Sequence, residues 1–139
     1  MERNPSLHGT DARKAHLATM CALFDHAVET APDNVALRHF GAALTYRELG
    51  RAVAALASDL AAMVAPGEVV ALVLPNSVDF PVAYFAALKA LAAPALLNPL
   101  YPAAQLSPLL REATRAWYCA RRRPRTWWPA SPVISASPA

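Results

Sequence analysis

Four histidines are the first side chains in this sequence that could bind a metal ion or act as general bases. They stand at His8, His16, His26 and His39. Either chemistry would need a compact motif in which two such residues lie four positions apart beside a carboxylate. No pair of these histidines has that arrangement. The spacing favours histidines in loops or on helix surfaces, and the sequence predicts no metal site.

Asn76 and Ser77 are polar residues at the end of a valine-rich segment. If that segment is a strand, both residues lie at its carboxyl end, where α/β proteins bind their ligands. The same residues also suit the start of a following helix, where a side-chain oxygen accepts a hydrogen bond from a backbone N–H. We favour the capping interpretation, and we predict no catalytic residue in this chain.

The C-terminal segment 117–139 differs in composition from everything before it. It holds four arginines and no acidic residue, whereas residues 1–116 hold nine Lys or Arg and ten Asp or Glu. The arginines lie near Trp127 and Trp128, and nucleic-acid or membrane-surface sites combine cations and stacking rings in this way. A GC-rich gene read out of frame would produce the same bias towards Arg, Pro, Trp, Ser and Ala. We favour that explanation and expect a disordered tail.

The overall composition is that of a globular protein. The chain has 139 residues, 55% of them apolar and 17% charged, which excludes a disordered chain. Cys21 and Cys119 are too few and too far apart for a disulfide framework or a CxxC metal site, so we expect a reduced, cytoplasmic protein. The polar N-terminus and the interruptions at Lys89, Pro94 and Asn98 support neither a signal peptide nor a membrane span.

The first part of the chain predicts a helix and a hairpin. From 13 to 30, apolar residues recur every three or four positions, which is typical of an amphipathic helix. Residues 35–40 indicate a short strand, and Gly41 begins a tight connection to Leu44. A β-hairpin is therefore expected between the first helix and the second.

The second helix has a clear start signal. Thr45 can cap the helix, and Glu48 is placed three residues later to reach back to the N–H of the cap, which makes a capping box. Tyr46 and Leu49 begin an apolar stripe that predicts a helix to about Val64. We therefore expect Thr45 and Glu48 to have a structural role.

The centre of the chain predicts a parallel βαβ unit. Residues 68–74 form a short, continuous apolar run, which indicates a strand buried on both faces. A helical stripe from Phe80 to Leu91 and a second short strand at 94–97 follow it. The fold class is therefore α/β.

One more helix and a division of the chain complete the expected organisation. Residues 103–114 can form a helix with Leu106, Leu109 and Leu110 directed inward. We expect a flexible N-terminus at 1–12, a partial α/β domain at 13–116 and an unrelated tail at 117–139.

Four motifs in order carry a resemblance to a known family. They are LTYREL at 44–49, PGEVVAL at 66–72, LPNSVDF at 74–80, and LKA with LNP at 88–90 and 97–99. Together they resemble the N-terminal part of the AMP-forming acyl- and aryl-CoA synthetases, the adenylate-forming family of luciferases and peptide-synthetase adenylation domains. The run PALLNP is most similar to aryl-CoA ligases of the 4-chlorobenzoate type. The resemblance implies a partial N-terminal subdomain of that fold.

The resemblance also implies a reaction in two steps. ATP and a carboxylic acid would give an acyl-adenylate and pyrophosphate, and coenzyme A would then take the acyl group, with Mg²⁺ assisting. The family's phosphate loop, Thr-Glu pair, ribose-binding aspartate and C-terminal lysine are absent here, and the glycines Gly9, Gly41, Gly50 and Gly67 are scattered. We therefore expect a truncated, frameshifted synthetase that is inactive alone.

Three positions depart from the family pattern, and Lys89 is the single candidate cofactor contact. The resemblance implies that Lys89 lies near a phosphate of coenzyme A, although a solvated helix lysine is the simpler interpretation. Leu91 replaces a usual glycine and could crowd the passage from helix to strand. Leu96 replaces a common proline, and Glu68 a usual aspartate.

Two other classes of function stay open. The chain could be a small α/β interaction module that docks to a partner, such as a separately encoded remainder of the synthetase. Its exposed apolar edge could also support self-association. It could also bind nucleic acid through the basic tail, in which case deleting 117–139 would abolish salt-sensitive binding.

Overall fold

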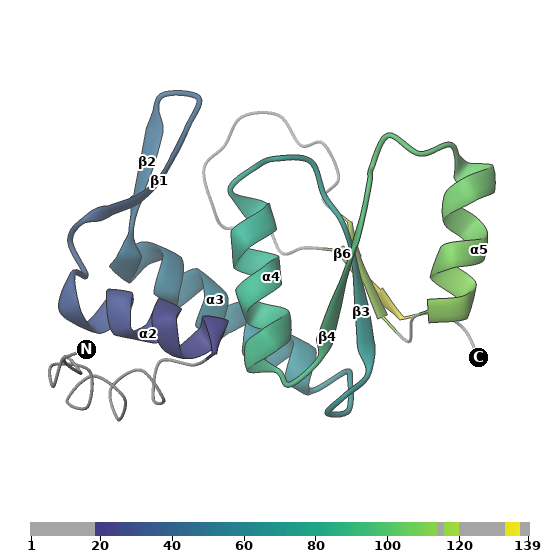
Figure 1. Ribbon diagram of the computed structural model, residues 1–139, viewed down its shortest axis with the longest axis horizontal. Coiled ribbons are helices and arrows are strands. Elements are labelled where there is room, and N and C mark those ends of the chain that lie inside the picture. The colour runs from purple at the N-terminus through teal and green to yellow at the C-terminus, as the bar shows by residue number, and fades with distance from the viewer. Residues whose placement is uncertain (1–18, 114–115, 120–132, 137–139) are drawn as a thin grey trace, which may run out of the picture.

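The computed structural model describes residues 19–113, 116–119 and 133–136, and it has the α/β fold that the sequence predicts (Figure 1). The helices are α2 (Met20–Thr30), α3 (Tyr46–Ala61), α4 (Asp79–Lys89) and α5 (Ala103–Ala113). The strands are β1 (Val35–His39), β2 (Ala42–Thr45), β3 (Val69–Val73), β4 (Ala93–Leu97), β5 (Ala116–Cys119) and β6 (Val133–Ala136).

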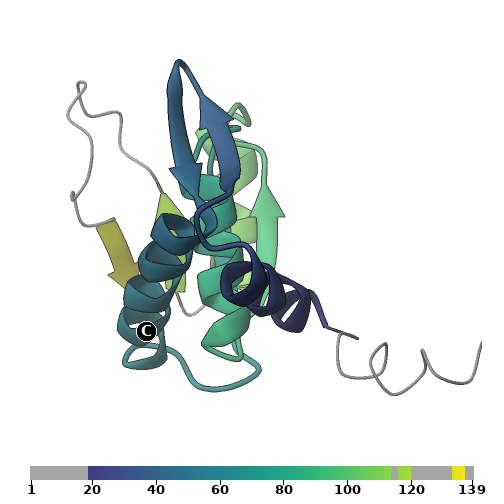
Figure 2. The same cartoon turned by 90° about the vertical axis from the view of Figure 1, so that its left-hand side faces the viewer.

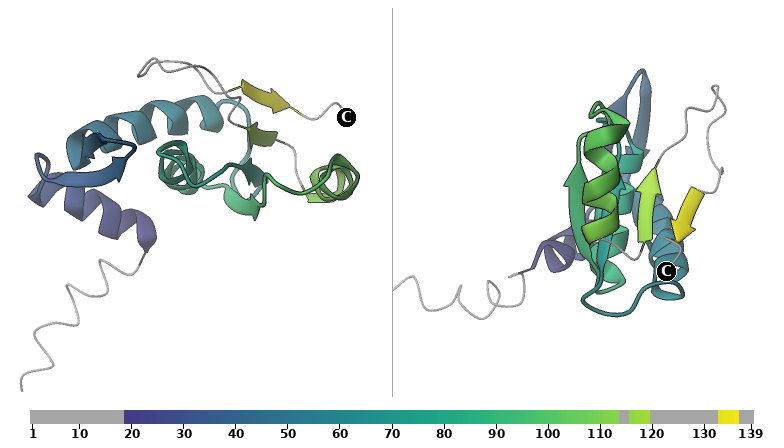
Figure 3. Two further views of the ribbon diagram at one scale, coloured as in Figure 1. Left: turned by 90° about the horizontal axis from the view of Figure 1, so that it is seen from above. Right: turned by 90° about the vertical axis from the view of Figure 1, so that its right-hand side faces the viewer.

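A parallel βαβ unit forms the centre of the molecule. β3 pairs in parallel with β4, so that Val69 lies opposite Ala93 and Val73 opposite Leu97, and α4 connects the two strands. Figure 3 shows α4 and α5 on opposite sides of this sheet. Because both faces of β3 are covered, Ala71 and Leu72 are at most 1% exposed. The prediction of a strand buried on both faces is confirmed.

The main core lies between the sheet and three helices. α3 packs against α4, and α2 contacts both of them. The apolar stripe predicted for α3 supplies core residues, among them Val53 and Leu60, which are at most 1% exposed. The helix ends at Ala61, earlier than predicted, because the chain turns at that point and leaves Met63 43% exposed.

The predicted hairpin is present and projects beyond the helices (Figure 2). β1 and β2 pair antiparallel, with His39 opposite Ala42. The two residues between them, Phe40 and Gly41, have φ angles of 45° and 83°. Positive φ at both central positions is the signature of a type I′ turn, whose twist matches that of the strands. Glycine meets that demand without strain, whereas Phe40 does so with its side chain exposed to solvent.

The C-terminal segment differs from the disordered tail that its composition predicts. β5 pairs in parallel with β3, and β6 pairs antiparallel with β5, which gives the strand order β4-β3-β5-β6. Trp117 and Tyr118 are strong strand formers, and β3 offers a second edge for pairing. Residues 120–132 and 137–139 of the same segment lie outside the described part of the chain.

Leu91 ends α4 in a conformation that usually belongs to glycine. Its N–H donates to the Leu88 carbonyl at 3.0 Å, and the next N–H, of Ala92, donates to the Ala87 carbonyl at 2.9 Å. These bonds define a Schellman motif, whose central residue takes a positive φ. The φ of Leu91 is 60°, and its side chain is 67% exposed. The departure from glycine therefore strains the backbone and does not crowd the helix-to-strand passage.

We expect the substitution Leu91→Gly to raise the free energy of unfolding by about 0.5–1 kcal/mol. The reason is that a left-handed conformation costs roughly 1–2 kcal/mol in a residue with a Cβ, and the greater freedom of glycine in the unfolded chain cancels part of the gain. Urea denaturation followed by circular dichroism measures the change. Leu91→Ala keeps the Cβ and serves as the control, so equal stability of the two variants would contradict the explanation.

Some expected details of the helices differ or fall outside the described residues. α2 begins at Met20 behind the cap Thr19, while residues 13–18 are not among those described. In α5, Leu106 and Leu110 are half-buried as predicted, but Leu109 is 41% exposed because the helix covers the sheet with one narrow face. In the described part of the chain, no helix combines the length and the apolar character needed to cross a membrane.

Candidate functional site

A depression lies at the carboxyl ends of β3 and β4, where parallel sheets place their ligand sites. Its volume is about 440 Å³, and it is open to solvent. Two segments line it, the turn after β3 and the end of β4 with the turn that follows. The lining residues are Leu74, Pro75, Asn76, Leu96, Leu97, Asn98, Pro99 and Leu100.

The parallel register brings the two asparagines of the depression to one edge of the sheet. Val73 and Leu97 are paired and end their strands together, so the residues beyond them leave the sheet at the same level. Asn98 then forms a local turn, in which its Oδ1 accepts from the Leu100 N–H at 2.9 Å and its carbonyl accepts from the Tyr101 N–H at 3.1 Å. This turn holds the loop after β4 in place.

The structure corrects the predicted capping role of Asn76 and Ser77. α4 begins at Asp79, and its N-cap residue is Val78, which makes no side-chain capping bond. The Ser77 hydroxyl instead donates to Oδ2 of Asp79 at 3.3 Å, and the Ser77 carbonyl accepts from the Phe80 N–H. Because the turn is longer than predicted, the cap position moves past both residues. Asn76 lines the depression. The Asp79 carboxylate, in the first turn of α4, interacts favourably with the positive end of the helix dipole.

The chemistry available in the depression is limited to apolar contact and neutral hydrogen bonding. Its lining contains leucines, prolines and two carboxamides, and no acid, base, cation or nucleophile. The lining therefore offers no charge to a phosphate and no group that transfers a proton. The described residues also contain no group of three His, Cys, Asp or Glu that could hold a metal ion.

Lys89 lies at the far end of α4 from this depression. The helix runs from Asp79 to Lys89, about 15 Å at 1.5 Å per residue. The Lys89 ammonium pairs with Asp25 Oδ1 on α2 at 2.6 Å, and the two side chains are 28% and 47% exposed. Lys89 therefore joins two helices and is not freely solvated. Its contact with coenzyme A stays a prediction, and the structure does not bring it together with Asn76.

Cys21 lies on α2 near this ion pair. Partial burial raises the pKa of the Cys21 thiol, and the Lys89 charge opposes this effect while the Asp25 charge adds to it. A thiol with a raised pKa is less reactive at neutral pH because less of it is thiolate. This environment indicates a structural cysteine.

The histidines do not come together in the described part of the chain. The His26 carbonyl accepts from the Thr30 hydroxyl, and the His39 ring meets the Phe40 ring edge-on at 4.4 Å. His8 and His16 lie outside the described residues, as does the arginine cluster 121–125.

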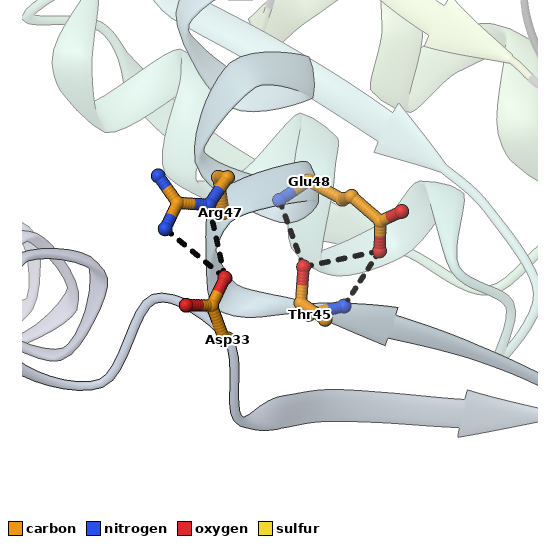
Figure 4. Close-up of polar contacts among 4 residues, drawn as sticks. All are labelled: Asp33, Thr45, Arg47 and Glu48. Atoms are coloured by element: carbon orange, nitrogen blue, oxygen red, sulfur yellow. Dashed lines mark hydrogen bonds and ion pairs between the residues drawn. The ribbon is translucent and has the colours of Figure 1, made fainter.

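Thr45 and Glu48 form the predicted capping box, which Figure 4 shows at the start of α3. The Thr45 Oγ accepts from the Glu48 N–H at 3.3 Å, and the Thr45 N–H donates to Glu48 Oε2 at 2.8 Å. The hydrogen bond from the Thr45 backbone N–H has the largest lowering effect on the pKa of the Glu48 carboxyl, and the bond with the Thr45 hydroxyl lowers this pKa further. Beside the box, Arg47 donates to Asp33 through Nε and Nη2 at 3.1 and 3.0 Å. Sequence reasoning missed this pair, which ties α3 to the turn before β1.

We expect Glu48→Gln to destabilise the protein at neutral pH and to have a smaller effect in acid. A charged acceptor bonds more strongly than a neutral amide at a helix N-terminus. Since the pKa of Glu48 is lowered in the folded state, its stabilisation is present above the unfolded pKa and is lost as the pH falls through the folded one.

Urea midpoints of both proteins at pH 7 and pH 3 measure this difference. The midpoint of the parent chain should exceed that of Glu48→Gln at pH 7, and the gap should narrow at pH 3. A gap that stays constant with pH would contradict the role of the charge. Asp59→Asn, on the exposed side of the same helix, controls for a general change in charge.

Comparison with known proteins finds a family model and several relatives that match most of this chain. Residues 24–122 match the family described as "AMP-binding enzyme". Gramicidin S synthase 2 of Brevibacillus brevis is 36% identical over 98 residues, which is 70% of this chain and 2% of that protein. The long-chain-fatty-acid–CoA ligase of Haemophilus influenzae is 34% identical over 93 residues, which is 66% of this chain and 16% of the ligase.

A solved structure gives the same fold. A benzoate CoA ligase from Burkholderia xenovorans LB400 is similar over 70% of this chain and 20% of its own, with a TM-score of 0.66 and 30% identity. The chain thus spans at most a fifth of the length of these three proteins. The sequence match continues through β5 to residue 122, past residue 116, where the partial domain was expected to end.

Proposed function

Since this chain belongs to the AMP-binding enzyme family, we propose that it forms the first part of a synthetase that activates a carboxylic acid with ATP. The acid would become an acyl-adenylate with release of pyrophosphate, and coenzyme A would then take the acyl group. The observation that carries the proposal is the family match over 24–122, on a fold like that of a benzoate CoA ligase. The carboxylate would be bound by residues outside the described part.

We further propose that the 139-residue chain does not catalyse this reaction alone. The described residues do not fit ATP with Mg²⁺, because the depression is uncharged and no cluster of metal-ligating side chains lies in them. The described glycines are also engaged elsewhere. Gly41 turns the hairpin, Gly50 lies within α3 against Val28, and Gly67 precedes β3 at the opposite end of that strand. They leave no nest of backbone N–H groups at the depression.

ATP–pyrophosphate exchange tests this proposal directly. We expect the purified chain, given ATP, Mg²⁺ and a panel of aryl and alkyl carboxylic acids, to show no exchange above a blank without protein. The benzoate CoA ligase from Burkholderia xenovorans with benzoate serves as the positive control. Exchange that depends on an added carboxylic acid would overturn the claim of inactivity.

The reading frame of 117–139 is a separate proposal. The support is compositional, since four arginines and no acid follow a body with nine basic and ten acidic residues. We propose that a frameshift produced this segment, and sequencing the gene from codon 105 onward tests it. A shifted frame that continues into a Ser/Thr/Gly-rich loop ending in Pro-Lys-Gly would support the proposal. Confirmation of the present frame, with an early stop in the shifted one, would overturn it.

A second candidate function is that of an interaction module that associates with itself. The specific observation is the exposure of apolar side chains at one edge of the sheet, where Leu96 is 53% and Leu100 87% exposed. Exposed leucines beside an open strand favour association. Sedimentation of the chain over a range of concentrations tests this candidate, and a strictly monomeric protein would exclude it.

A further inference from the structure

The outer edge of β4 carries an inference about how two copies of this chain meet. Among the strands that the structure describes, β4 is the last on its side of the sheet and pairs with β3 alone. Its sequence is APALL, which has no charged residue. An open strand without charge is a template for pairing with another chain.

The backbone groups that face outward follow from the pairing with β3. The Ala93 N–H donates to the Glu68 carbonyl at 2.9 Å, so Ala93 faces β3. Along a strand, the backbone N–H and C=O groups of successive residues point to opposite sides, so those of Ala95 and Leu97 also point towards β3. The polar groups of Pro94, Leu96 and Asn98 therefore face away from the sheet.

These outward groups are complementary to a second copy of themselves. We propose that two copies pair antiparallel through β4, about a two-fold axis at Leu96. The Leu96 N–H of each copy then donates to the Leu96 carbonyl of the other. The Asn98 N–H of each copy donates to the Pro94 carbonyl of the other. A two-fold contact of this kind uses one surface on both copies and closes as a dimer.

Pro94 selects this register instead of preventing the contact. It has no N–H, so the Asn98 carbonyl opposite it in the second copy receives no bond across the interface. That carbonyl already accepts from the Tyr101 N–H at 3.1 Å, and no buried acceptor is left without a donor. In the register that moves the axis to Ala95, Leu96 faces Pro94. Each Leu96 carbonyl would then lie opposite a residue that cannot donate.

The side chains at the axis favour the same contact. Leu96 is 53% exposed, and in the proposed register it lies opposite its own copy, so that each leucine covers the other. The apolar residues of the depression, including Leu100, continue this surface. Because none of these residues is charged, no like charges meet across the axis. Apolar burial and the backbone bonds therefore act together.

This inference deepens the self-association proposed above and rests on it. The first experiment measures mass by size-exclusion chromatography with light scattering over a range of concentrations. We expect the parent chain to reach twice the mass of one copy. Leu96→Asp should run as a monomer because two carboxylates would face each other at the axis. Leu109→Asp, on α5 and 41% exposed, is the matched control and should stay dimeric.

The second experiment tests the register by cross-linking and does not depend on the aspartate variant folding. In the proposed pairing, the Cα atoms of the two copies of residue 96 lie about 5.5 Å apart, within the range for a disulfide. Under oxidised glutathione, Leu96→Cys should form a covalent dimer through residue 96, identified by mass spectrometry of the linked peptide. Ala93→Cys is the control, because it is exposed on the same strand but faces residue 99 of the other copy.

The outcomes separate this inference from the broader one. A dimer linked at residue 96, with no symmetric link at residue 93, supports pairing through β4. A dimer without the 96–96 link overturns β4 as the interface and leaves self-association in place. A chain that stays monomeric at all concentrations overturns both.

Discussion

Leu72→Ala is expected to lower the free energy of unfolding by about 2–5 kcal/mol, the usual cost of truncating a buried leucine. Leu72 lies in β3, opposite Leu96 of β4 on one side and Tyr118 of β5 on the other, and it is 1% exposed. Its side chain belongs to the core between the sheet and the helices. Because the paired strands hold the backbone on both sides, the cavity has little room to collapse. Urea denaturation followed by circular dichroism measures the loss.

Leu23→Ala is the matched control for this prediction. The substitution is the same, but Leu23 is 49% exposed and lies on α2, away from the edge of β4, so the free energy of unfolding should change by no more than about 0.5 kcal/mol. Equal losses for the two variants would contradict the placement of β3 at the centre of the core. Leu72→Ala should also lower the urea concentration at the midpoint of unfolding without changing the m-value, the slope of the unfolding free energy against urea concentration.

Phe24→Ala has the second large expected effect, a loss of about 3–5 kcal/mol. Phe24 is 6% exposed and is the buried residue of α2. Its ring stacks on Phe85 of α4 with the centroids 4.3 Å apart and the planes 16° apart. The stacked pair holds α2 against the rest of the core, and the Lys89–Asp25 ion pair lies at the same helix contact.

The effect of Phe24→Ala should be concentrated in α2. Hydrogen exchange should show the amides of α2 losing protection before those of β3, since the ring is the main apolar contact of this helix. Leu23→Ala, at the neighbouring position and 49% exposed, is the control and should leave the exchange of α2 nearly unchanged. Uniform loss of protection across the chain would contradict a local role for Phe24.

The elements that rest on neighbouring residues were predictable from the sequence. The capping box at Thr45 and Glu48 needs only residues three positions apart, and the structure forms it as predicted. The strand at 69–73 was marked by its apolar run, and the presence of a hairpin by Gly41. The turn itself lies one residue earlier than predicted, at Phe40 and Gly41, and Ala42 already belongs to β2. These local patterns predict the structure correctly because the interactions of each one form within a single turn or strand.

The start of α4 shows where local reasoning fails. Asn76 and Ser77 are good capping residues, yet the chain passes them in a longer turn and begins the helix at Asp79. The position of α4 is decided by its packing on β3 and α3, which outweighs the small preference of one cap. As a result Asn76 lines the depression at the sheet edge, which is the location that the ligand-site alternative assigned to it.

The sequence by itself determined the helices, the hairpin and the parallel βαβ unit of this protein, since their periodicity and turn residues act over short distances. Only the tertiary structure decided which distant groups meet. Lys89 and Asp25 are 64 positions apart and pair because α2 packs on α4. The pairing of β5 with β3, in a segment whose composition predicts disorder, depends on the free edge that β3 offers. Pairing and packing partners are chosen by the geometry of the whole core, which no local pattern encodes.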